Sequence, residues 1–185
     1  LYSIDLLPEA GHKMPAFVNL QQTHVEATLH ARYAALAGEV RFRNTVTALE
    51  PRADGVLLTV DTPDGTYRID AAWVVSCEGV RSTARRALGL AFQGQVFEDK
   101  FLIADVRMTR ADFPTERWFW FDPPFHDGQT ALLHRQADDV WRIDLQLGWD
   151  ADAEAEKQPE RVRPRIERML GHGDFTLEWL SVYVF

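Results

Sequence analysis

The stretch 71–90, A-A-W-V-V-S-C-E-G-V-R-S-T-A-R-R-A-L-G-L, constrains the fold of this chain more than any other. Residues 71–77 are apolar or small, a run too short for a buried helix but suited to a strand covered on both faces, as in a parallel sheet. A turn at Gly79 follows, and Ser82 or Thr83 can then cap a short helix. The order strand, glycine turn, helix predicts a phosphate-binding corner, because unpaired N–H groups at a helix N-terminus attract negative charge.

An ordinary strand-to-helix turn is the alternative, because the stretch lacks the complete glycine fingerprint of dinucleotide binding.

The stretch contains Cys77, the only cysteine in the chain, which excludes an internal disulfide and fits the reducing cytoplasm. Free cysteine is among the most buried residue types, so the sequence predicts that Cys77 is buried as a small hydrophobic residue.

The residues around Cys77 resemble the central motif of the flavoprotein aromatic hydroxylases, the para-hydroxybenzoate hydroxylase family. In that family apolar residues precede Cys-Asp-Gly, and Ser and Arg follow. Cys77, Gly79, Ser82 and Arg85 match the motif, and Glu78 stands where the family has Asp. The resemblance implies that this segment lies against FAD and near the path of NADH or NADPH. The longer side chain of Glu78 leaves its contact with the cofactor open.

The bulk properties limit the classes of protein. With 185 residues the chain can form one large or two small domains, and 46% apolar and 26% charged residues are typical of a globular protein. A net charge of −8 disfavours a nucleic-acid partner, and no apolar run is long enough to span a membrane. Both ends look cut, so we expect a fragment whose N- and C-terminal parts are missing. The oligomeric state, including a homo-oligomer, stays open.

The first half reads as part of a cofactor domain. Helical spacing of apolar residues predicts a helix from Asn19 to Gly38, in which Gln22 could complete a capping box with Asn19. By resemblance, Gln22 contacts FAD, and Val46 lies near its adenosine half; the alternative for Val46 is a core position. The strand predicted at 39–49 carries Val46, and Asp-Gly turns then predict an antiparallel hairpin that returns to the strand at 71–77.

The second half reads as a β-rich domain. Four strand-like segments between 91 and 149, rich in β-branched and aromatic residues, predict a largely antiparallel sheet with one face on a core and the other free for a ligand. Residues 154–158 read as a polar linker, 159–170 as a helix, and 175–185 as a final strand. W-F-W-F at 118–121 should split its rings between the two faces. We expect one face in the core; the alternative for the other face is an apolar pocket or an interface with the missing parts.

These elements predict a mixed α/β (α+β) fold: a partial Rossmann-like FAD-binding half-domain joined to an antiparallel β-sheet substrate domain. We expect the FAD part at 1–90, with 1–18 a loop or an edge on the substrate side. The substrate sheet should occupy 91–174 with its helix at 159–170, and the strand 175–185 should return toward the FAD domain.

No sequence pattern in the chain predicts a catalytic group that acts without a cofactor. Its six histidines lack zinc-site spacing, and no serine has the Gly-x-Ser-x-Gly context of a nucleophile. That absence fits an enzyme whose cofactor carries the chemistry. By resemblance, Arg142 in V-W-R-I-D-L-Q-L lies near the flavin ring; the alternative is a surface arginine that pairs with Asp144. The full set of predicted cofactor-binding residues is Gln22, Val46, Glu78, Gly79, Ser82, Arg85 and Arg142, with no catalytic residue named and no metal site.

The resemblance implies an FAD-dependent aromatic monooxygenase. Such an enzyme uses NADH or NADPH and O2 to hydroxylate a small phenolic or other aromatic substrate through a flavin hydroperoxide. As a fragment, the chain is expected to bind FAD weakly and to be inactive alone. Two alternatives stay open at this point: another flavoprotein of the same fold, such as a halogenase or a reductase, or a non-catalytic β-rich binding module.

Overall fold

The structure is a computed structural model that describes residues 3–4, 10–95, 97–108, 113 and 115–184. The chain divides into two compact units: the first comprises Leu1–His30 and Val96–Phe185, and the second comprises Ala31–Gln95. Helix α1, Gln22–Ala35, spans the point where the chain passes from the first unit to the second. Part of the segment 1–18 lies outside the described residues.

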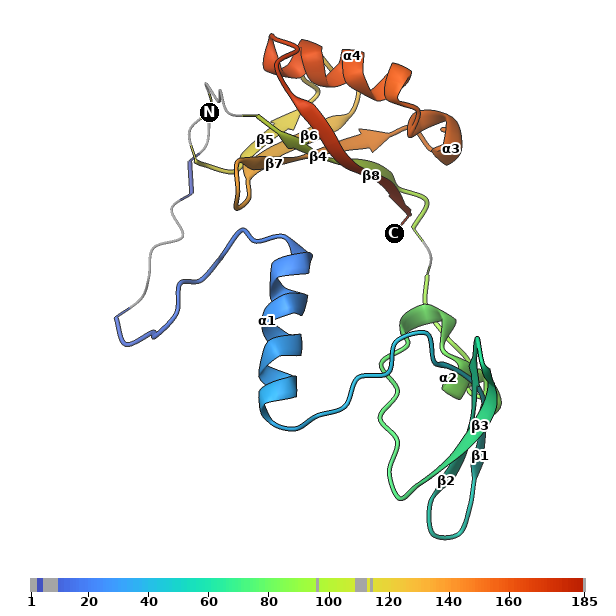
Figure 1. The fold of residues 1–185 in the computed structure, drawn as a ribbon. Coiled ribbons are helices and arrows are strands. Elements are labelled where there is room, and N and C mark those ends of the chain that lie inside the picture. Colours follow the sequence, from blue (N-terminus) through green and yellow to red (C-terminus); the bar gives the residue numbers. More distant parts are fainter. Residues whose placement is uncertain (1–2, 5–9, 96, 109–112, 114, 185) are drawn as a thin grey trace. The chain divides into compact units, whose positions relative to one another are not determined.

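The first unit is built on a five-stranded sheet with the order β5-β6-β7-β4-β8, in which every neighbouring pair is antiparallel (Figure 1). This confirms the antiparallel sheet predicted at 91–149. The final strand predicted at 175–185 is also present, and it lies beside β4. The strands are β4 Lys100–Arg107, β5 Trp118–Phe121, β6 Thr130–Arg135, β7 Val140–Leu147 and β8 Thr176–Val184.

Helix α4, Pro159–Leu170, covers one face of this sheet, as Figure 1 shows. The helix begins with proline at its first turn and ends before Gly171, whose φ of +78° suits a residue without a Cβ. Its apolar side is buried, and the bounds and the buried side agree with the sequence prediction. The core on this side of the sheet includes Leu102, Ala104, Leu133, Trp141, Ile143, Leu145, Val162 and Ile166.

A short helix precedes α4 where the sequence predicted a linker. Helix α3, Ala153–Glu156, begins because the side chain of Asp152 accepts hydrogen bonds from the backbone N–H groups of Glu154 and Ala155. The nearly buried carboxylate of Glu156 forms ion pairs with Arg161, at 2.8 Å, and Arg165 on α4. The linker prediction for 154–158 was therefore wrong, because the capping role of Asp152 went unrecognised.

The second unit is a small three-stranded antiparallel sheet with one short helix packed on it. Strands β1 Thr45–Pro51, β2 Val56–Thr62 and β3 Gly65–Ala71 follow one another as two hairpins. The two Asp-Gly turns confirm the predicted hairpins, but β1 begins only at Thr45 and not at residue 39. Helix α2, Thr83–Ala87, packs against β1 through the buried Ala84. The mixed helix-and-sheet fold class is thus confirmed.

Apart from Ala71, the last residue of β3, the predicted strand at 71–77 is not part of a sheet. Strand β3 ends at Ala71, and the backbone from Ala72 to Cys77 pairs with no strand in the described part of the chain. Trp73 is 91% exposed, and Cys77 is exposed as well, so its predicted burial was wrong. The apolar pattern identifies a segment suited to burial, but a strand forms only where a neighbouring strand pairs with its N–H and C=O groups.

The N-terminus of α2 is closed by side chains of the chain itself. One carboxylate oxygen of Glu78 accepts hydrogen bonds from the hydroxyl groups of Ser76 and Ser82, each at 2.8 Å, and from the N–H of Ala84 at 3.0 Å. The Ser82 hydroxyl in turn accepts from the N–H of Arg85. The expectation of unpaired N–H groups at this corner was therefore wrong, since a carboxylate already occupies the anion-attracting position.

We predict that Ile166→Ala on α4 destabilises the first unit. Ile166 is fully buried between α4 and the sheet, so truncation leaves a cavity and lowers the free energy of unfolding by roughly 2–5 kcal/mol. Denaturant unfolding followed by tryptophan fluorescence measures the loss. Arg168→Ala, at an exposed position of the same helix, is the control and should change stability by less than about 0.5 kcal/mol. Equal effects of the two substitutions would contradict the assigned packing.

We also predict that Glu78→Gln destabilises the second unit in a pH-dependent way. The hydrogen bonds from the Ala84 N–H and from the two serine hydroxyls lower the pKa of Glu78 to about 2. The carboxylate therefore contributes its stability above its unfolded pKa and loses it as the pH falls through the folded value. Thermal unfolding followed by circular dichroism should show a lower midpoint than wild type at pH 7 and a smaller difference near pH 2. The exposed Glu50→Gln in β1 is the matched control; if it lowers the midpoint as much, the capping account is wrong.

Candidate functional site

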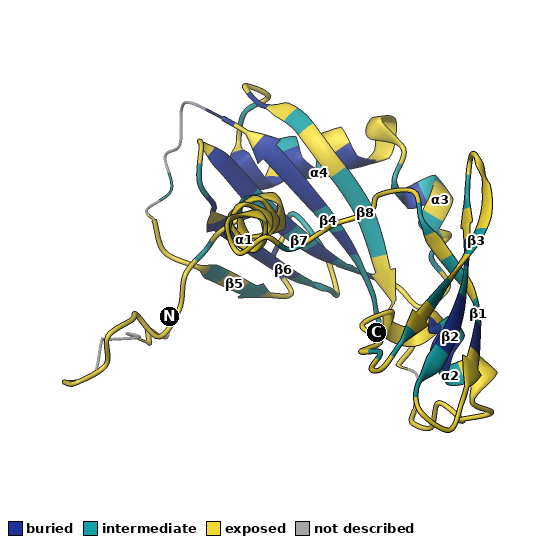
Figure 2. Cartoon of the chain, turned by 60° about the horizontal axis from the view of Figure 1, so that its bottom comes forward, coloured by how far each residue is buried: buried dark blue, intermediate teal, exposed yellow. Residues whose placement is uncertain are grey.

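The face of the five-stranded sheet opposite α4 carries the polar groups of the first unit. Strand alternation directs Arg142, Asp144 and Gln146 of β7 to this open face, while Trp141, Ile143 and Leu145 enter the core. In Figure 2 the strands of this sheet carry both buried and partly exposed residues, and along β7 the two kinds alternate from Trp141 to Leu147 as this pattern requires. The open face is thus where a ligand can meet charged side chains that rigid strands hold in place.

Arg142 is held in place by Asp105 on the neighbouring strand. The two residues lie directly opposite each other in the β4–β7 pair, and the guanidinium binds the carboxylate through two hydrogen bonds of 2.8 Å. The hydrogen bonds to Asp105 also raise the pKa of Arg142, so the guanidinium stays charged. The alternative pairing of Arg142 with Asp144 was wrong, because residues two apart on a strand are farther from each other than directly opposed cross-strand partners.

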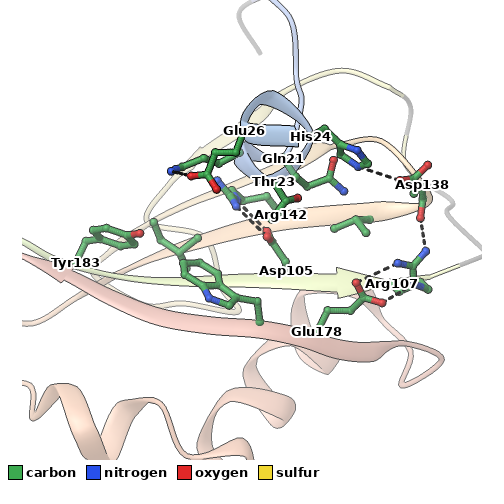
Figure 3. Close-up of a pocket in the computed structure, with 14 residues that line it drawn as sticks. Gln21, Thr23, His24, Glu26, Asp105, Arg107, Asp138, Arg142, Glu178 and Tyr183 are labelled. Atoms are coloured by element: carbon green, nitrogen blue, oxygen red, sulfur yellow. Dashed lines mark hydrogen bonds and ion pairs between the residues drawn. The ribbon is translucent and has the colours of Figure 1, made fainter. Parts of the chain in front are cut away.

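The first turn of α1 is attached to the turn between β6 and β7. The side-chain amide of Gln21 donates to the C=O of Ala137 at 2.9 Å and accepts from its N–H at 3.2 Å. The ring of His24 lies 3.0 Å from the carboxylate of Asp138, as Figure 3 shows. These contacts join residues that are far apart in sequence and fix the start of α1 over the open face.

A cavity of about 530 Å³ lies between this first turn and the sheet. We call it the α1 cavity. Gln22 and Arg142, two of the predicted cofactor-binding residues, both line it. Two nitrogens of Arg142 are used by Asp105, and its third nitrogen, Nη1, makes no hydrogen bond within the described part of the chain. The other lining residues are Gln21, Thr23, His24, Glu26, Ile103, Asp105, Arg107, Asp138, Val140, Glu178, Trp179 and Tyr183.

The helix N-terminus differs from the prediction at Gln22. Helix α1 begins at Gln22 rather than just after Asn19, and the Gln22 amide donates to the carboxylate of Glu26 at 2.6 Å instead of reaching back to Asn19. The capping-box interpretation was therefore wrong. The predicted contact of Gln22 with FAD stays a prediction.

Asp144 is the most perturbed carboxyl group of the open face. Burial raises its pKa to about 6, although the nearby charges of Arg142 and Arg117 act in the opposite direction. Its Oδ1 is buried and lacks a hydrogen-bond partner among the described residues. On the next strand, burial and the same two arginines lower the pKa of His134 to about 4, so its ring is neutral at pH 7.

The remaining predicted site residues lie in the second unit. Val46 of β1 lines a shallow hollow together with Thr83 and Arg86 of α2. Glu78 and Ser82 form the cap of α2, and Gly79 opens the preceding 3₁₀ turn Gly79–Arg81 with a φ of +67°. Arg85 folds back on that turn and donates to the C=O of Val80 at 2.5 Å. The cofactor-binding role of all five predicted residues stays a prediction.

The aromatic strand β5 divides its rings between two environments, as alternation predicts. Trp118 and Trp120 pack against the core, whereas Phe119 and Phe121 are 54% and 78% exposed on the open face.

The sequence analysis did not identify Asp105 or Gln21 as residues of the site, and it considered Asp144 only as a partner of Arg142. Three polar residues at alternate positions of the otherwise apolar strand 140–147 were the available signal for a polar sheet face.

The described residues contain no helix of the length and apolar character needed to cross a bilayer. They also contain no group of three or more His, Cys, Asp or Glu side chains arranged to hold a metal ion.

Comparison with known proteins identifies the family. Residues 3–185 match the family described as FAD binding domain. The 12-dehydrotetracycline 5-monooxygenase/anhydrotetracycline 6-monooxygenase of Streptomyces rimosus is 39% identical over 106 residues, which cover 57% of this chain and 20% of that protein. A 3-(3-hydroxy-phenyl)propionate/3-hydroxycinnamic acid hydroxylase of Mycobacterium sp. strain JLS is 33% identical over 165 residues, 89% of this chain and 27% of that protein.

A solved structure shares the fold. The p-nitrophenol 4-monooxygenase of Pseudomonas putida DLL-E4 superposes with a TM-score of 0.75 at 24% identity, over 89% of this chain and 42% of that one. The chain therefore spans less than half the length of each of these proteins. Because the family match extends over nearly the whole sequence, the chain belongs to the FAD binding domain family of aromatic hydroxylases and monooxygenases.

Proposed function

We propose that this chain is the part of an FAD-dependent monooxygenase that lines the flavin and the substrate, and that the enzyme hydroxylates a small phenolic or other aromatic compound with O2 and NADH or NADPH. The observation that carries the proposal is that Gln22 and Arg142, which lie 120 positions apart, line the same α1 cavity. The family resemblance assigns both of them to the flavin. The relatives, which are named as monooxygenases and hydroxylases, support the reaction class.

The residues of the α1 cavity fit a flavin. Arg142 offers a fixed positive charge with one nitrogen still available, and Asp105 keeps the guanidinium from rotating. A preoriented charge of this kind stabilises negative charge on a bound group without reorganisation. The central carbon of the Arg142 guanidinium lies over the ring of Trp179, 5.8 Å from the ring centre, so Trp179 adds an aromatic side to the cavity. When bound, FAD supplies the redox chemistry, and the chain supplies position, charge and exclusion of water.

The same proposal assigns roles to the two units. The first unit, with its open sheet face, contributes the substrate side and the flavin ring contacts. In the second unit, the residues predicted to contact FAD are Val46, Glu78, Gly79, Ser82 and Arg85. A location in the cytoplasm accords with the single cysteine and the reducing cofactors. The family match weighs against a non-catalytic β-rich module, the alternative that needs no flavin.

We expect the chain to bind FAD weakly and to depend on Arg142 for that binding. Replacing Arg142 alone would leave the carboxylate of Asp105 buried and unpaired, so the informative variant is Arg142→Met combined with Asp105→Asn. Loss of the charge-assisted contact should weaken FAD binding by about tenfold. Quenching of flavin fluorescence during titration gives the affinity, and circular dichroism verifies that the variant is folded.

Arg168→Ala on α4 is the matched control, because it removes an arginine from an exposed helix position that lines none of the cavities described above. Its FAD affinity should equal that of wild type. The proposal fails if the wild-type chain does not bind FAD at all, or if the double variant binds it as tightly as wild type. Oxidation of NADH or NADPH by the chain alone would contradict the expectation that it lacks turnover.

A further inference from the structure

A second hollow, of about 200 Å³, lies on the same open face of the sheet. We call it the Asp144 hollow. Its walls come from four adjacent strands, and the strand registers place Phe119, Leu132, Asp144 and Ile103 side by side in one row across β5, β6, β7 and β4. Ile103 also lines the α1 cavity, so the two spaces adjoin. The other residues of the hollow are Phe101, Thr130 and Ala131.

Asp144 is the one charged residue among these wall residues. Its row differs from the next row along the strands, in which Arg142 donates two hydrogen bonds to Asp105 and lies over the ring of Trp179. Asp144 has no such partner: its Oδ1 is buried and accepts no hydrogen bond from the described residues. Buried polar atoms are almost always paired, so an acceptor at a cavity wall that has no donor among the described residues is suited to a donor on a bound molecule.

The shape and polarity of the hollow define that donor. Phenylalanine, leucine and isoleucine side chains form most of the wall, which favours a flat apolar group. The volume is sufficient for one ring, since a cavity of about 150 Å³ holds a benzene molecule. The Cβ–Cγ torsion of aspartate is broad, so rotation about this bond can present either carboxylate oxygen to the hollow.

We propose that the Asp144 hollow binds an aromatic ring that carries a hydroxyl group, and that this hydroxyl donates a hydrogen bond to the Asp144 carboxylate. The inference deepens the proposed function, because it rests on that function for the claim that the bound ring is the substrate. The ring would then sit beside the α1 cavity, with its hydroxyl anchored on β7. Asp144 is a substrate-binding residue in this account.

The charges around Asp144 are consistent with this role. Arg142 on the same strand, Arg117 ahead of β5 and Asp105 on β4 all act on it, and His134 on β6 is neutral at pH 7. With its pKa near 6, Asp144 is ionised at pH 8 and accepts a charge-assisted hydrogen bond. Protonation at pH 5 should weaken the preference for a hydroxylated ring.

The test compares phenol with anisole, which has the same ring but no O–H. Ligand-observed NMR measures both affinities for the chain at pH 8 with no flavin present. We expect phenol to bind about tenfold more tightly than anisole, the value typical of one hydrogen bond to a charged group. Equal affinities for the two ligands would overturn the proposal.

Two substitutions locate the effect. Asp144→Leu removes the acceptor without leaving an unpaired polar group, so it should bring the phenol-to-anisole ratio to about 1 while anisole still binds. Asp144→Asn keeps a neutral acceptor and should give an intermediate ratio. Asp127→Asn, in an exposed turn, is the matched control and should keep the wild-type ratio. An unchanged ratio in the Asn variant, or in a folded Leu variant, would overturn the proposal.

The outcome separates this inference from the proposed function. If the chain distinguishes phenol from anisole through Asp144 but does not bind FAD, the ring site stands and the monooxygenase proposal fails. If FAD binds through Arg142 but the Asp144 variants leave the ratio unchanged, the cofactor proposal stands and the ring site falls.

Discussion

The register between β4 and its two neighbours determines the rest of the first unit. Pairing of β4 with β7 on one side and β8 on the other places Leu102, Ala104 and Val106 toward α4 and Ile103 and Asp105 toward the open face. A shift by one residue would exchange these faces and bury the charged groups in the core. The buried apolar area against α4 therefore fixes the register, and the register in turn brings Asp105 opposite Arg142.

This register places the charged residues of the open face in rows that run across the neighbouring strands. Arg142 and Asp105 form a partly buried pair with two hydrogen bonds, which holds a positive charge in one orientation at the α1 cavity. One row along the strands, Asp144 lies among apolar side chains and has an elevated pKa. Arg142 and Asp144 are close together on β7, yet their environments differ. Arg142 lies opposite Asp105, which has the opposite charge, whereas Asp144 lies opposite the apolar Ile103.

The sequence predicted local structure well wherever local rules determine it. The bounds of α4, the two Asp-Gly hairpins and the alternation of β5 and β7 all follow from periodicity and turn chemistry. The errors arose where the outcome depends on distant residues. Residues 71–77 have the composition of a buried strand, but a strand needs a neighbour, and none of the described strands pairs with residues 72–77.

The candidate site was predictable only in part, for the same reason. Family resemblance selected Gln22 and Arg142, and the structure adds that both line one cavity. Asp105 and Gln21 could not be found from spacing, because their partners lie 37 and 116 residues away and are set by strand register and by the β6–β7 turn. At the turn around Glu78, the local sequence pattern predicted an open anion-binding site. In the structure the carboxylate of Glu78 itself accepts the N–H of Ala84 at the start of α2.

The central claim is that the open face of the five-stranded sheet, at the first turn of α1, is the flavin-binding surface. Backbone amide chemical shifts of the chain, recorded by NMR while FAD is added, test it most directly. The account predicts shift changes at Gln22 and at Arg142 and its β4 partner Asp105, with no change at Ile166 on the covered face. Saturation with FAD that leaves Gln22 and Arg142 unperturbed would contradict it.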